Sequence, residues 1–306
     1  MEGYVKLIEL CEVGPRDGLQ NEKKHLTVED RVELIRRLQH AGLKKIEAVS
    51  FVNPKVVPQM AHAEEVLEAI PRMADVRYAG LVLSPGGMER ALRCNLDDIH
   101  LVLSASRAFN LKNVRKTTDE SMELLLPLVD FAKQSGRKVT LTIGNAFGCP
   151  YEGDIPFTKV LRITEKFAAR GVNQVTLADT TGRANPRQVK ENVEAFWKAF
   201  PKMKLGLHFH NTRGLGLVNV YAGYQAGVRS FDSSIGGLGG CPFAPTAAGN
   251  VCTEDMVHLF QQIGEETSAN LELLIETAKW IEKKVNRRLD GLVMKAGPAN
   301  TVVKSE

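Results

Sequence analysis

One pattern of apolar and polar positions repeats along the chain up to about residue 264. A stretch with the apolar spacing of an amphipathic helix ends on a glycine or an asparagine, and a short run rich in aliphatic and β-branched residues follows at once. The residues that end five of these stretches are Gly42, Asn95, Gly136, Gly171 and Gly227. Glycine and asparagine tolerate the left-handed backbone conformation just past a helix end, so the pattern predicts helices that alternate with strands.

The strand-like runs number eight, and their number predicts the fold class. They lie at residues 6–13, 45–49, 76–83, 99–103, 138–143, 175–179, 205–209 and 230–233. Helical patterns lie between them, for example at 27–40, where Thr27 and Asp30 resemble a capping box. Eight alternating β and α units with right-handed crossovers predict an α/β fold, a (β/α)8 TIM barrel. A doubly wound open sheet is the alternative, but no G-x-G-x-x-G motif follows the first run.

We expect a single catalytic domain over residues 1–306, because no linker or low-complexity segment interrupts the pattern. The barrel is expected at about 5–264 and a helical extension at about 265–300. Within the extension, residues 271–285 form an amphipathic pattern, which indicates a C-terminal cap on the barrel or a contact between subunits.

Composition and charge exclude several classes of protein. Hydrophobic residues make up 43% of the chain and charged residues 25%, which is typical of a globular protein with a sizeable core. The net charge is only +4 and the charges are interspersed, so we expect no nucleic-acid partner. No apolar run is long enough to span a bilayer, and the strand-like start leaves no room for a signal peptide. The cysteines are odd in number and form no CxxC, which favours reduced thiols in the cytoplasm; they are Cys11, Cys94, Cys149, Cys241 and Cys252.

Two histidines in the seventh strand-like run suggest a metal site. Successive side chains of a strand alternate between its faces, so His208 and His210 project together while Phe209 packs on the other side. Two imidazoles on one face provide half of a divalent-metal site if oxygen ligands come from elsewhere. The alternative interpretation is a pair of core or pocket histidines whose hydrogen bonds are satisfied within the protein.

Oxygen ligands are available at the same predicted rim. In a TIM barrel the chemistry takes place at the carboxyl ends of the strands, where Asp17 follows the first run and Asn250 follows the eighth. Strands one, seven and eight are neighbours in a closed barrel, so a carboxylate, two imidazoles and an amide oxygen can meet there. Such a set suits a hard cation, Mg²⁺ or Mn²⁺, with water or substrate completing an octahedron.

Each polar residue at this rim also has a simpler interpretation. Arg16 and Asp17 are compatible with a surface ion pair in a turn, and Glu47 with a polar group that pairs with a cation inside the barrel. The pair Asp179-Thr180 is compatible with a helix cap, and we expect Thr253 to cap the helix that starts near Glu254.

Several segments together resemble the 3-hydroxy-3-methylglutaryl-CoA lyase family. The resemblance runs in order from about Ile8 to Ile263. The segments that carry it are Val13-Gly14-Pro15-Arg16-Asp17-Gly18-Leu19-Gln20-Asn21-Glu22, Ser50-Phe51-Val52 with Pro54-Lys55, Gly148-Cys149-Pro150-Tyr151-Glu152-Gly153, His208-Phe209-His210, Gly236 to Pro242, and Gly249-Asn250 with Thr253-Glu254-Asp255.

The resemblance implies a TIM barrel that catalyses a retro-Claisen cleavage of 3-hydroxy-3-methylglutaryl-CoA to acetyl-CoA and acetoacetate. It implies a divalent metal held by four residues, the set that ligand chemistry also suggests: Asp17, His208, His210 and Asn250. An acyl-CoA is then the expected small-molecule partner, and we expect a homo-oligomer, a dimer or larger.

The same resemblance implies roles for further residues. Arg16 matches an arginine that contacts the thioester end of the substrate, and Glu47 matches an acidic residue needed around Arg16. Cys241 matches a catalytic cysteine on a mobile glycine-rich loop, which protonates the enolate or gates the site. Gln20 and Ser50, which lie in the matching segments, are expected to contact substrate. His208 and Asp17 both remain candidates for the base that takes the hydroxyl proton.

Departures from the family pattern concern the acyl group. Asn211 and Arg213 stand where lyases of the family often have Asp and Tyr, and Arg107 stands where many have Glu. A cation at these positions suits a carboxylate or a phosphate of the substrate, whereas the simpler interpretation is a solvent-exposed side chain. A larger or differently charged 3-hydroxyacyl-CoA is therefore an alternative substrate.

Two other functions are compatible with this barrel. One is a condensing synthase that joins acetyl-CoA to a 2-oxo acid, although no regulatory domain follows the barrel pattern. The other is a catalytically silent binding subunit, but all four predicted ligand positions and Cys241 are filled.

Overall fold

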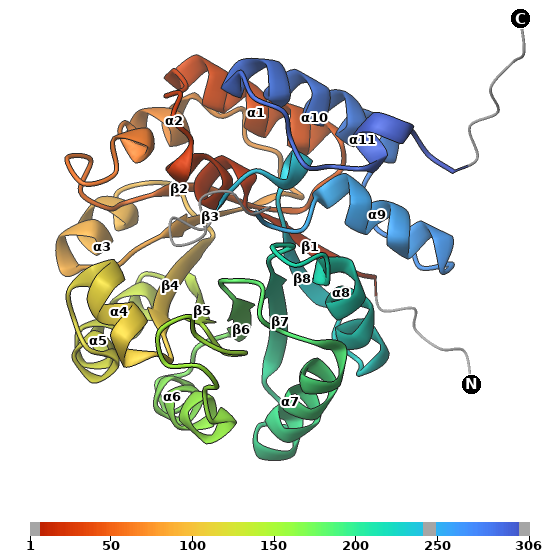
Figure 1. The fold of residues 1–306 in the computed structure, drawn as a ribbon. Coiled ribbons are helices and arrows are strands. Elements are labelled where there is room, and N and C mark those ends of the chain that lie inside the picture. The colour runs from red at the N-terminus through yellow and green to blue at the C-terminus, as the bar shows by residue number, and fades with distance from the viewer. Residues whose placement is uncertain (1–6, 241–248, 300–306) are drawn as a thin grey trace, which may run out of the picture.

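Eight parallel strands close into a barrel (Figure 1). The computed structural model describes residues 7–240 and 249–299. Each strand pairs in parallel with the next, and β8 pairs with β1, so the order around the barrel is β1 to β8. The strands are β1 (Glu9–Glu12), β2 (Lys45–Ser50), β3 (Arg77–Leu81), β4 (Asp98–Ser104), β5 (Lys138–Gly144), β6 (Gln174–Asp179), β7 (Lys204–Phe209) and β8 (Ser230–Ser233). The predicted (β/α)8 TIM barrel is confirmed, and the open doubly wound sheet is wrong.

Helices surround the barrel as an outer layer, with one or two after each of the strands β1 to β7 and three after β8 (Figure 1). They are α1 (Val28–His40), α2 (Ala63–Ala69), α3 (Pro85–Leu92), α4 (Arg107–Val114), α5 (Thr118–Gln134), α6 (Phe157–Ala169), α7 (Pro186–Ala199), α8 (Gly216–Gln225), α9 (Thr253–Gln262), α10 (Leu271–Val285) and α11 (Val293–Ala296). Among the described residues, no helix is both long and apolar enough to cross a membrane.

The predicted helix ends are confirmed at all four glycines. Gly42, Gly136, Gly171 and Gly227 each adopt a positive φ angle. At Gly42 an added Cβ atom would lie 2.2 Å from the carbonyl oxygen of Ser268, so both the conformation and the close approach require glycine.

Two other predictions about helix ends need correction. In the described part of the chain Asn95 has no positive φ; α3 instead ends in successive tight turns, in which the Cys94 N–H donates to the Ala91 carbonyl. Thr27 caps α1 by accepting from the Asp30 N–H, but the Asp30 carboxylate pairs with Lys284 and does not complete a capping box.

The C-terminal extension contains the predicted helix, α10, which lies beside α1 in the outer layer (Figure 1). Its apolar face is buried within the same chain, and Lys284 pairs with Asp30 on α1 at 2.7 Å. The Arg37 guanidinium of α1 lies 4.9 Å from the centre of the Trp280 ring. Of the two predicted roles for this helix, packing on the barrel is the one that uses its apolar face.

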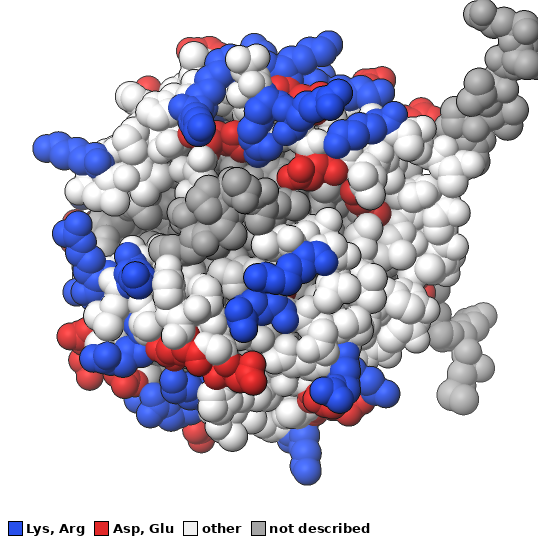
Figure 2. All heavy atoms as spheres, viewed as in Figure 1, with Lys and Arg blue, Asp and Glu red and all other residues white. Residues whose placement is uncertain are grey.

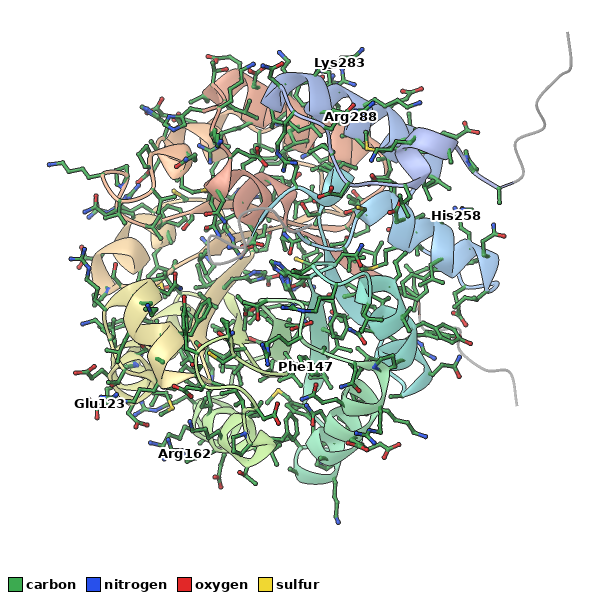
Figure 3. The ribbon with its side chains drawn as sticks, in the orientation of Figure 1. Glu123, Phe147, Arg162, His258, Lys283 and Arg288 are labelled. Atoms are coloured by element: carbon green, nitrogen blue, oxygen red, sulfur yellow. The ribbon has the colours of Figure 1, made fainter. Side chains whose placement is uncertain are left out.

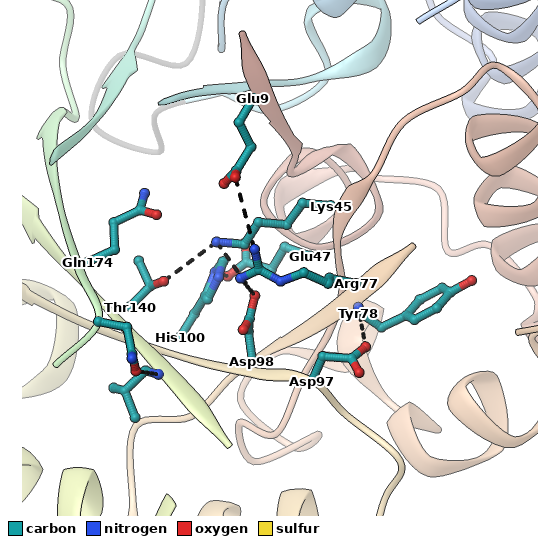
Figure 4. Close-up of polar contacts among 12 residues, drawn as sticks. Glu9, Lys45, Glu47, Arg77, Tyr78, Asp97, Asp98, His100, Thr140 and Gln174 are labelled. Atoms are coloured by element: carbon teal, nitrogen blue, oxygen red, sulfur yellow. Dashed lines mark hydrogen bonds and ion pairs between the residues drawn. The ribbon is translucent and has the colours of Figure 1, made fainter. Parts of the chain in front are cut away.

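The inside of the barrel is polar, whereas the space between strands and helices is apolar. Gln174 on β6 donates to Ser230 on β8, and Lys45 on β2 approaches Thr140 on β5 within 3.5 Å. Contacts between strands that are not neighbours must cross the barrel interior. A column of polar side chains therefore lies below the rim, and Figure 4 shows the part of it between β2 and β4.

Candidate active site

A single π-helical turn, η1 (Gly14–Gly18), follows β1 and carries Arg16 and Asp17. The N–H groups of Arg16, Asp17 and Gly18 all point at the Val13 carbonyl, at 3.1, 2.7 and 3.2 Å. A Cβ atom added to Gly18 would lie 2.8 Å from Leu238 in the loop after β8, so glycine lets the two loops approach. The turn thereby holds Arg16 and Asp17 at the carboxyl end of the barrel, as the sequence predicts.

His208 and His210 face the same way from β7, with their ring centroids 5.2 Å apart. Phe209 points to the other side, where its ring lies 5.5 Å from that of Phe147, which is labelled in Figure 3. One ligand-type atom from each of Asp17, His208 and His210 lies within 4.8 Å of the other two. The structure therefore brings these three predicted metal ligands together.

Asn250 joins this group through backbone pairing. His210 forms an antiparallel bridge with Asn250, and the Val251 N–H donates to the Phe209 carbonyl at 3.1 Å. The Asn250 side-chain amide donates to Asp17 at 2.9 Å, while its buried Oδ1 has no hydrogen-bond partner among the described residues. The amide oxygen is thus free to act as a ligand, and we call the set Asp17, His208, His210 and Asn250 the rim cluster.

The charge states of Asp17 and His210 suit a cation. Burial alone would raise the pKa of Asp17, but the nearby Arg16 charge and the two histidines lower it to about 2. Burial, followed by the His208 charge, lowers the pKa of His210 to about 4, so His210 is neutral at neutral pH. Its Nδ1 has no hydrogen-bond partner in the described structure. An ionised carboxylate and a neutral imidazole are the forms in which these side chains bind metals.

Arg16 is held between two carboxylates. Its Nε donates to Glu47 at 2.6 Å, and its Nη1 donates to Asp17 at 2.6 Å. Burial would lower the pKa of Arg16, but Glu47 and Asp17 raise it, so the guanidinium keeps its charge. The register between β2 and β3 shifts between Glu47 and Val49, and such irregularities often redirect side chains near active sites. The guanidinium beside the rim cluster is therefore fixed in direction.

The other predicted site residues differ in what the structure shows of them. Gln20 donates to Asp17 at 3.0 Å, so it supports the rim cluster. Ser50, at the end of β2, is buried, and its hydroxyl has no hydrogen-bond partner among the described residues. Cys241 lies outside the described residues.

The comparisons with known proteins agree with this geometry. A family model described as HMGL-like matches residues 7–281. The chain belongs to the HMGL-like family. It is 41% identical to a hydroxymethylglutaryl-CoA lyase of Bacillus subtilis over 286 residues, and the matched region covers 94% of this chain and 96% of that protein. It is 39% identical to the (R)-citramalyl-CoA lyase of Chloroflexus aurantiacus over 311 residues, and the matched region covers 98% of each chain.

A solved structure is similar over its whole length. The HMG-CoA lyase of Acinetobacter baumannii, determined in complex with coenzyme A and 3-methylmalate, has a TM-score of 0.94 and 40% identity, and the match covers 100% of both chains. The family resemblance seen in the sequence is confirmed. As a member of the HMGL-like family, the chain is an enzyme, a carbon–carbon lyase.

Two of the three residues that were expected to depart from the family pattern, Arg213 and Arg107, have different surroundings. Arg213 donates from Nη1 to the carbonyls of Thr181 and Gly182, at 2.8 and 2.9 Å, and so braces the loop after β6. Arg107 is exposed at the start of α4. Arg213 therefore has a structural contact that the sequence did not reveal.

Two predicted caps have other roles in the structure. Asp179 accepts from the N–H groups of Arg183 and Ala184 and shapes the loop after β6, whereas Asn185 caps α7. Thr253 does not cap α9; it is buried, and its hydroxyl donates to Glu12 at 2.6 Å. Thr253 is the first residue of α9, one position too late for the cap, and it turns inward to a buried carboxylate.

One residue of the site was missed in the sequence. Asp232 on β8 is in register with His208, and its carboxylate lies 3.3 Å from His208 Nδ1. Burial would lower the pKa of His208, but the bond to Asp232 and its charge raise it. A carboxylate on one ring nitrogen orients the other nitrogen toward a metal. The sequence contained one signal for this contact: Asp232 lies in the eighth strand-like run, which is next to the seventh run in a closed barrel.

Proposed function

We propose that this enzyme is a divalent-metal-dependent lyase that cleaves 3-hydroxy-3-methylglutaryl-CoA to acetyl-CoA and acetoacetate. The observation that carries the proposal is the rim cluster beside the fixed guanidinium of Arg16. The names of the relatives support the substrate class, since those described above are acyl-CoA lyases.

The residues of the rim cluster fit a hard divalent cation. Asp17 supplies a carboxylate, His208 and His210 supply imidazoles, and Asn250 supplies an amide oxygen. Buried polar atoms without partners among the described residues, His210 Nδ1 and Asn250 Oδ1, support this fit, since such atoms are rare. A Mg²⁺ or Mn²⁺ ion bound there would act as a Lewis acid toward the hydroxyl oxygen of the substrate.

The protein groups then account for the bond changes. His208 or Asp17 accepts the proton of the tertiary hydroxyl, the C3–O bond becomes a carbonyl and the C2–C3 bond breaks. The electron pair of that bond moves into an enolate of the thioester. The Arg16 guanidinium stabilises the enolate oxygen, and Cys241 is the proposed donor of the proton that converts C2 into the methyl group of acetyl-CoA.

The test is a screen of acyl-CoA thioesters with product identification, run with Mg²⁺, with Mn²⁺ and after chelation. We expect stoichiometric acetyl-CoA and acetoacetate from 3-hydroxy-3-methylglutaryl-CoA, with activity lost on chelation and restored by the metal. Full activity in excess chelator, with no metal detectable in the protein, contradicts the metal-dependent mechanism. Release of free CoA from acetyl-CoA and a 2-oxo acid would favour a condensing synthase.

A second candidate substrate is a citramalyl-type thioester. It is favoured by the 39% identity to the (R)-citramalyl-CoA lyase and by the 3-methylmalate in the similar solved structure. Both substrates carry a 3-hydroxyacyl-type carbon skeleton that the same bond cleavage can break. The ratio of kcat/KM between the two thioesters decides which is the better substrate.

We also propose that the chain acts as a single catalytic domain and assembles as a homo-oligomer. Three apolar side chains are exposed at the start of α8 and along it: Leu215, which directly precedes the helix, Val218 and Tyr221. Over the face shown in Figure 2, lysine and arginine side chains alternate with aspartate and glutamate, which is compatible with contacts between like subunits. Light scattering coupled to size exclusion measures the mass of the particle and tests the assembly.

A further inference from the structure

Two side chains of β4 face into the barrel and meet partners on β2 (Figure 4). Asp98 lies 3.8 Å from the Lys45 ammonium, and one level closer to the rim His100 Nδ1 lies 2.9 Å from Glu47 Oε1. β3 separates these strands, and the residue that it places in register with Glu47 is Ala79. A methyl group at this position leaves room for the two longer side chains to meet above β3.

The Glu47 carboxylate binds two partners through different oxygens. Oε2 accepts from Arg16 Nε at 2.6 Å and lies 2.5 Å from Nη2, whereas Oε1 faces His100. Glu47 and His100 are 1% and 5% exposed, so water does not compete for either contact. His100, Glu47 and Arg16 thus form one chain of contacts that runs from inside the barrel to the rim.

The direction of the His100 hydrogen bond follows from the state of Glu47. Burial would raise the pKa of Glu47, but the Arg16 charge and His100 lower it below its ordinary value. An ionised carboxylate has only acceptor lone pairs, so His100 Nδ1 carries the hydrogen and donates it. The other ring nitrogen, Nε2, is buried and has no hydrogen-bond partner in the described part of the chain.

We propose that His100 is a positioning residue, which holds the Glu47 carboxylate in the orientation that aims the Arg16 guanidinium at the substrate. The inference rests on the proposed function, in which Arg16 stabilises the enolate. Without His100, Oε1 is a buried acceptor with no donor, and the carboxylate is free to rotate about its last side-chain bond. Arg16 makes two contacts with the other oxygen, so its guanidinium turns with the carboxylate.

The first test compares His100→Leu with His100→Asn. Leucine removes the donor, whereas the asparagine amide nitrogen reaches the place of Nδ1 and keeps it. We expect His100→Leu to lower kcat by about tenfold to a hundredfold with KM changed by less than about threefold, and His100→Asn to recover most of the lost kcat. Equal kcat in both variants and the parent overturns the proposal.

A double-mutant cycle tests whether His100 acts through Arg16. Arg16→Lys alone is expected to lower kcat by about 10²–10³-fold, because lysine keeps the charge but loses the planar fork. His100→Leu added to Arg16→Lys is expected to cost little more, since the group that it positions is already lost. Losses that multiply in full show that His100 does not act through Arg16.

A matched control separates positioning from general stability. Gln174 is also a buried polar residue of the barrel interior, but it contacts Thr176 and Ser230 and not Glu47. Gln174→Met is expected to lower the melting temperature and leave kcat within about twofold of the parent. A drop in kcat as large as that of His100→Leu would assign the effect to the whole polar interior and overturn the proposal.

One measurement does not depend on the substrate. The ¹⁵N–¹H signal of Arg16 Nε, identified by its loss in Arg16→Lys, reports the bond to Glu47. We expect this signal to shift in His100→Leu and to stay near its parent position in His100→Asn and Gln174→Met. An unmoved signal in His100→Leu overturns the proposal. If the signal does shift but the parent enzyme does not cleave 3-hydroxy-3-methylglutaryl-CoA, the result contradicts the proposed function alone.

Discussion

Within residues 7–240 and 249–299, two groups of side chains bring ligand-type atoms within 4.8 Å of one another, and one of the two is suited to a metal. The rim cluster contains Asp17, His208 and His210; the other group, which we call the α9 cluster, contains Cys252, Glu254 and Asp255. Both have a buried oxygen without a hydrogen-bond partner among the described residues, Asn250 Oδ1 in the first and Glu254 Oε1 in the second, so what separates them is the charge state of the acidic groups. In the α9 cluster, Asp255 accepts from backbone N–H groups at the start of α11, and Glu254 accepts from the Gly236 N–H at 3.0 Å.

The charge states separate the clusters further. Burial raises the pKa of Glu254 to about 8, so this carboxyl group is protonated at neutral pH, whereas Asp17 with its pKa of about 2 is ionised. In the α9 cluster Glu254 is thus an uncharged carboxyl group that holds the chain around Gly236, whereas the rim cluster has an ionised carboxylate beside the neutral imidazole of His210. Closeness of ligand atoms does not make a metal site; the atoms must also be ionised or neutral as the metal requires and free of other bonds.

The largest expected effect compares His210→Ala with Glu254→Gln. His210→Ala removes one imidazole of the rim cluster, so we expect loss of most bound Mn²⁺ and a drop in activity of more than about a hundredfold, with the fold kept. Glu254→Gln should leave the bound metal and the activity unchanged, because glutamine keeps the acceptor for Gly236. Metal content after dialysis and steady-state kinetics measure both. Metal retained by His210→Ala, or lost in Glu254→Gln, would reverse the assignment of the two clusters.

A smaller effect distinguishes two cysteines. Burial raises the pKa of Cys252 well above its ordinary range, so its thiol is unreactive. Cys241 is the proposed functional thiol. We expect an alkylating reagent to inactivate the parent and Cys252→Ser at the same rate, and substrate to protect both proteins. The residual activity of Cys241→Ser is expected to be lost at least about tenfold more slowly. Equal inactivation rates in Cys241→Ser and the parent would place the sensitive thiol elsewhere.

The smallest expected effect concerns stability and not catalysis: Glu254 changes how the free energy of unfolding depends on pH. The folded protein keeps a proton on Glu254 up to its pKa of about 8, whereas the unfolded chain releases it near the ordinary value of 4.5. The contribution of Glu254 to the free energy of unfolding is therefore largest below pH 4.5 and falls as pH rises toward about 8, by at most about 1.4 kcal/mol per pH unit. Glu12, with its pKa raised to about 7, contributes in the same direction.

Glu254→Gln is neutral at every pH, so this part of the pH dependence should disappear. Urea unfolding at about pH 5 and about pH 8 measures the change, and the variant is expected to lose less stability than the parent between the two. Parallel stability curves for the two proteins would show that Glu254 is already ionised in the folded state.

The prediction of the fold from the sequence was nearly complete, and the prediction of the site was partial. The positions of all eight strands and the ends at Gly42, Gly136, Gly171 and Gly227 follow from local patterns. The errors were at positions where a residue type permits a conformation without requiring it. Asn95 tolerates a left-handed backbone, but the chain leaves α3 by ordinary turns instead.

The candidate site shows the same division between local and distant contacts. The facing of His208 and His210 follows from the alternation of a strand, and the position of Asp17 follows from the rim rule for TIM barrels. The contacts of Asp232 with His208 and of His100 with Glu47 were not predicted, because they join segments that are 24 and 53 residues apart. Nothing in the local pattern of either strand states which residue of the other it will meet.

The sequence by itself determined the number and order of the strands and helices, the common direction of the two histidines and the family. These depend on backbone geometry over a few neighbouring residues and on motifs that stay together in the chain. Only the tertiary structure decided three other contacts of carboxyl groups: Asp232 with His208, Glu47 with His100, and Glu12 with the Thr253 hydroxyl. Closure of the barrel sets the register between strands, and a shift of one residue, such as that near Glu47, changes which side chains share the interior.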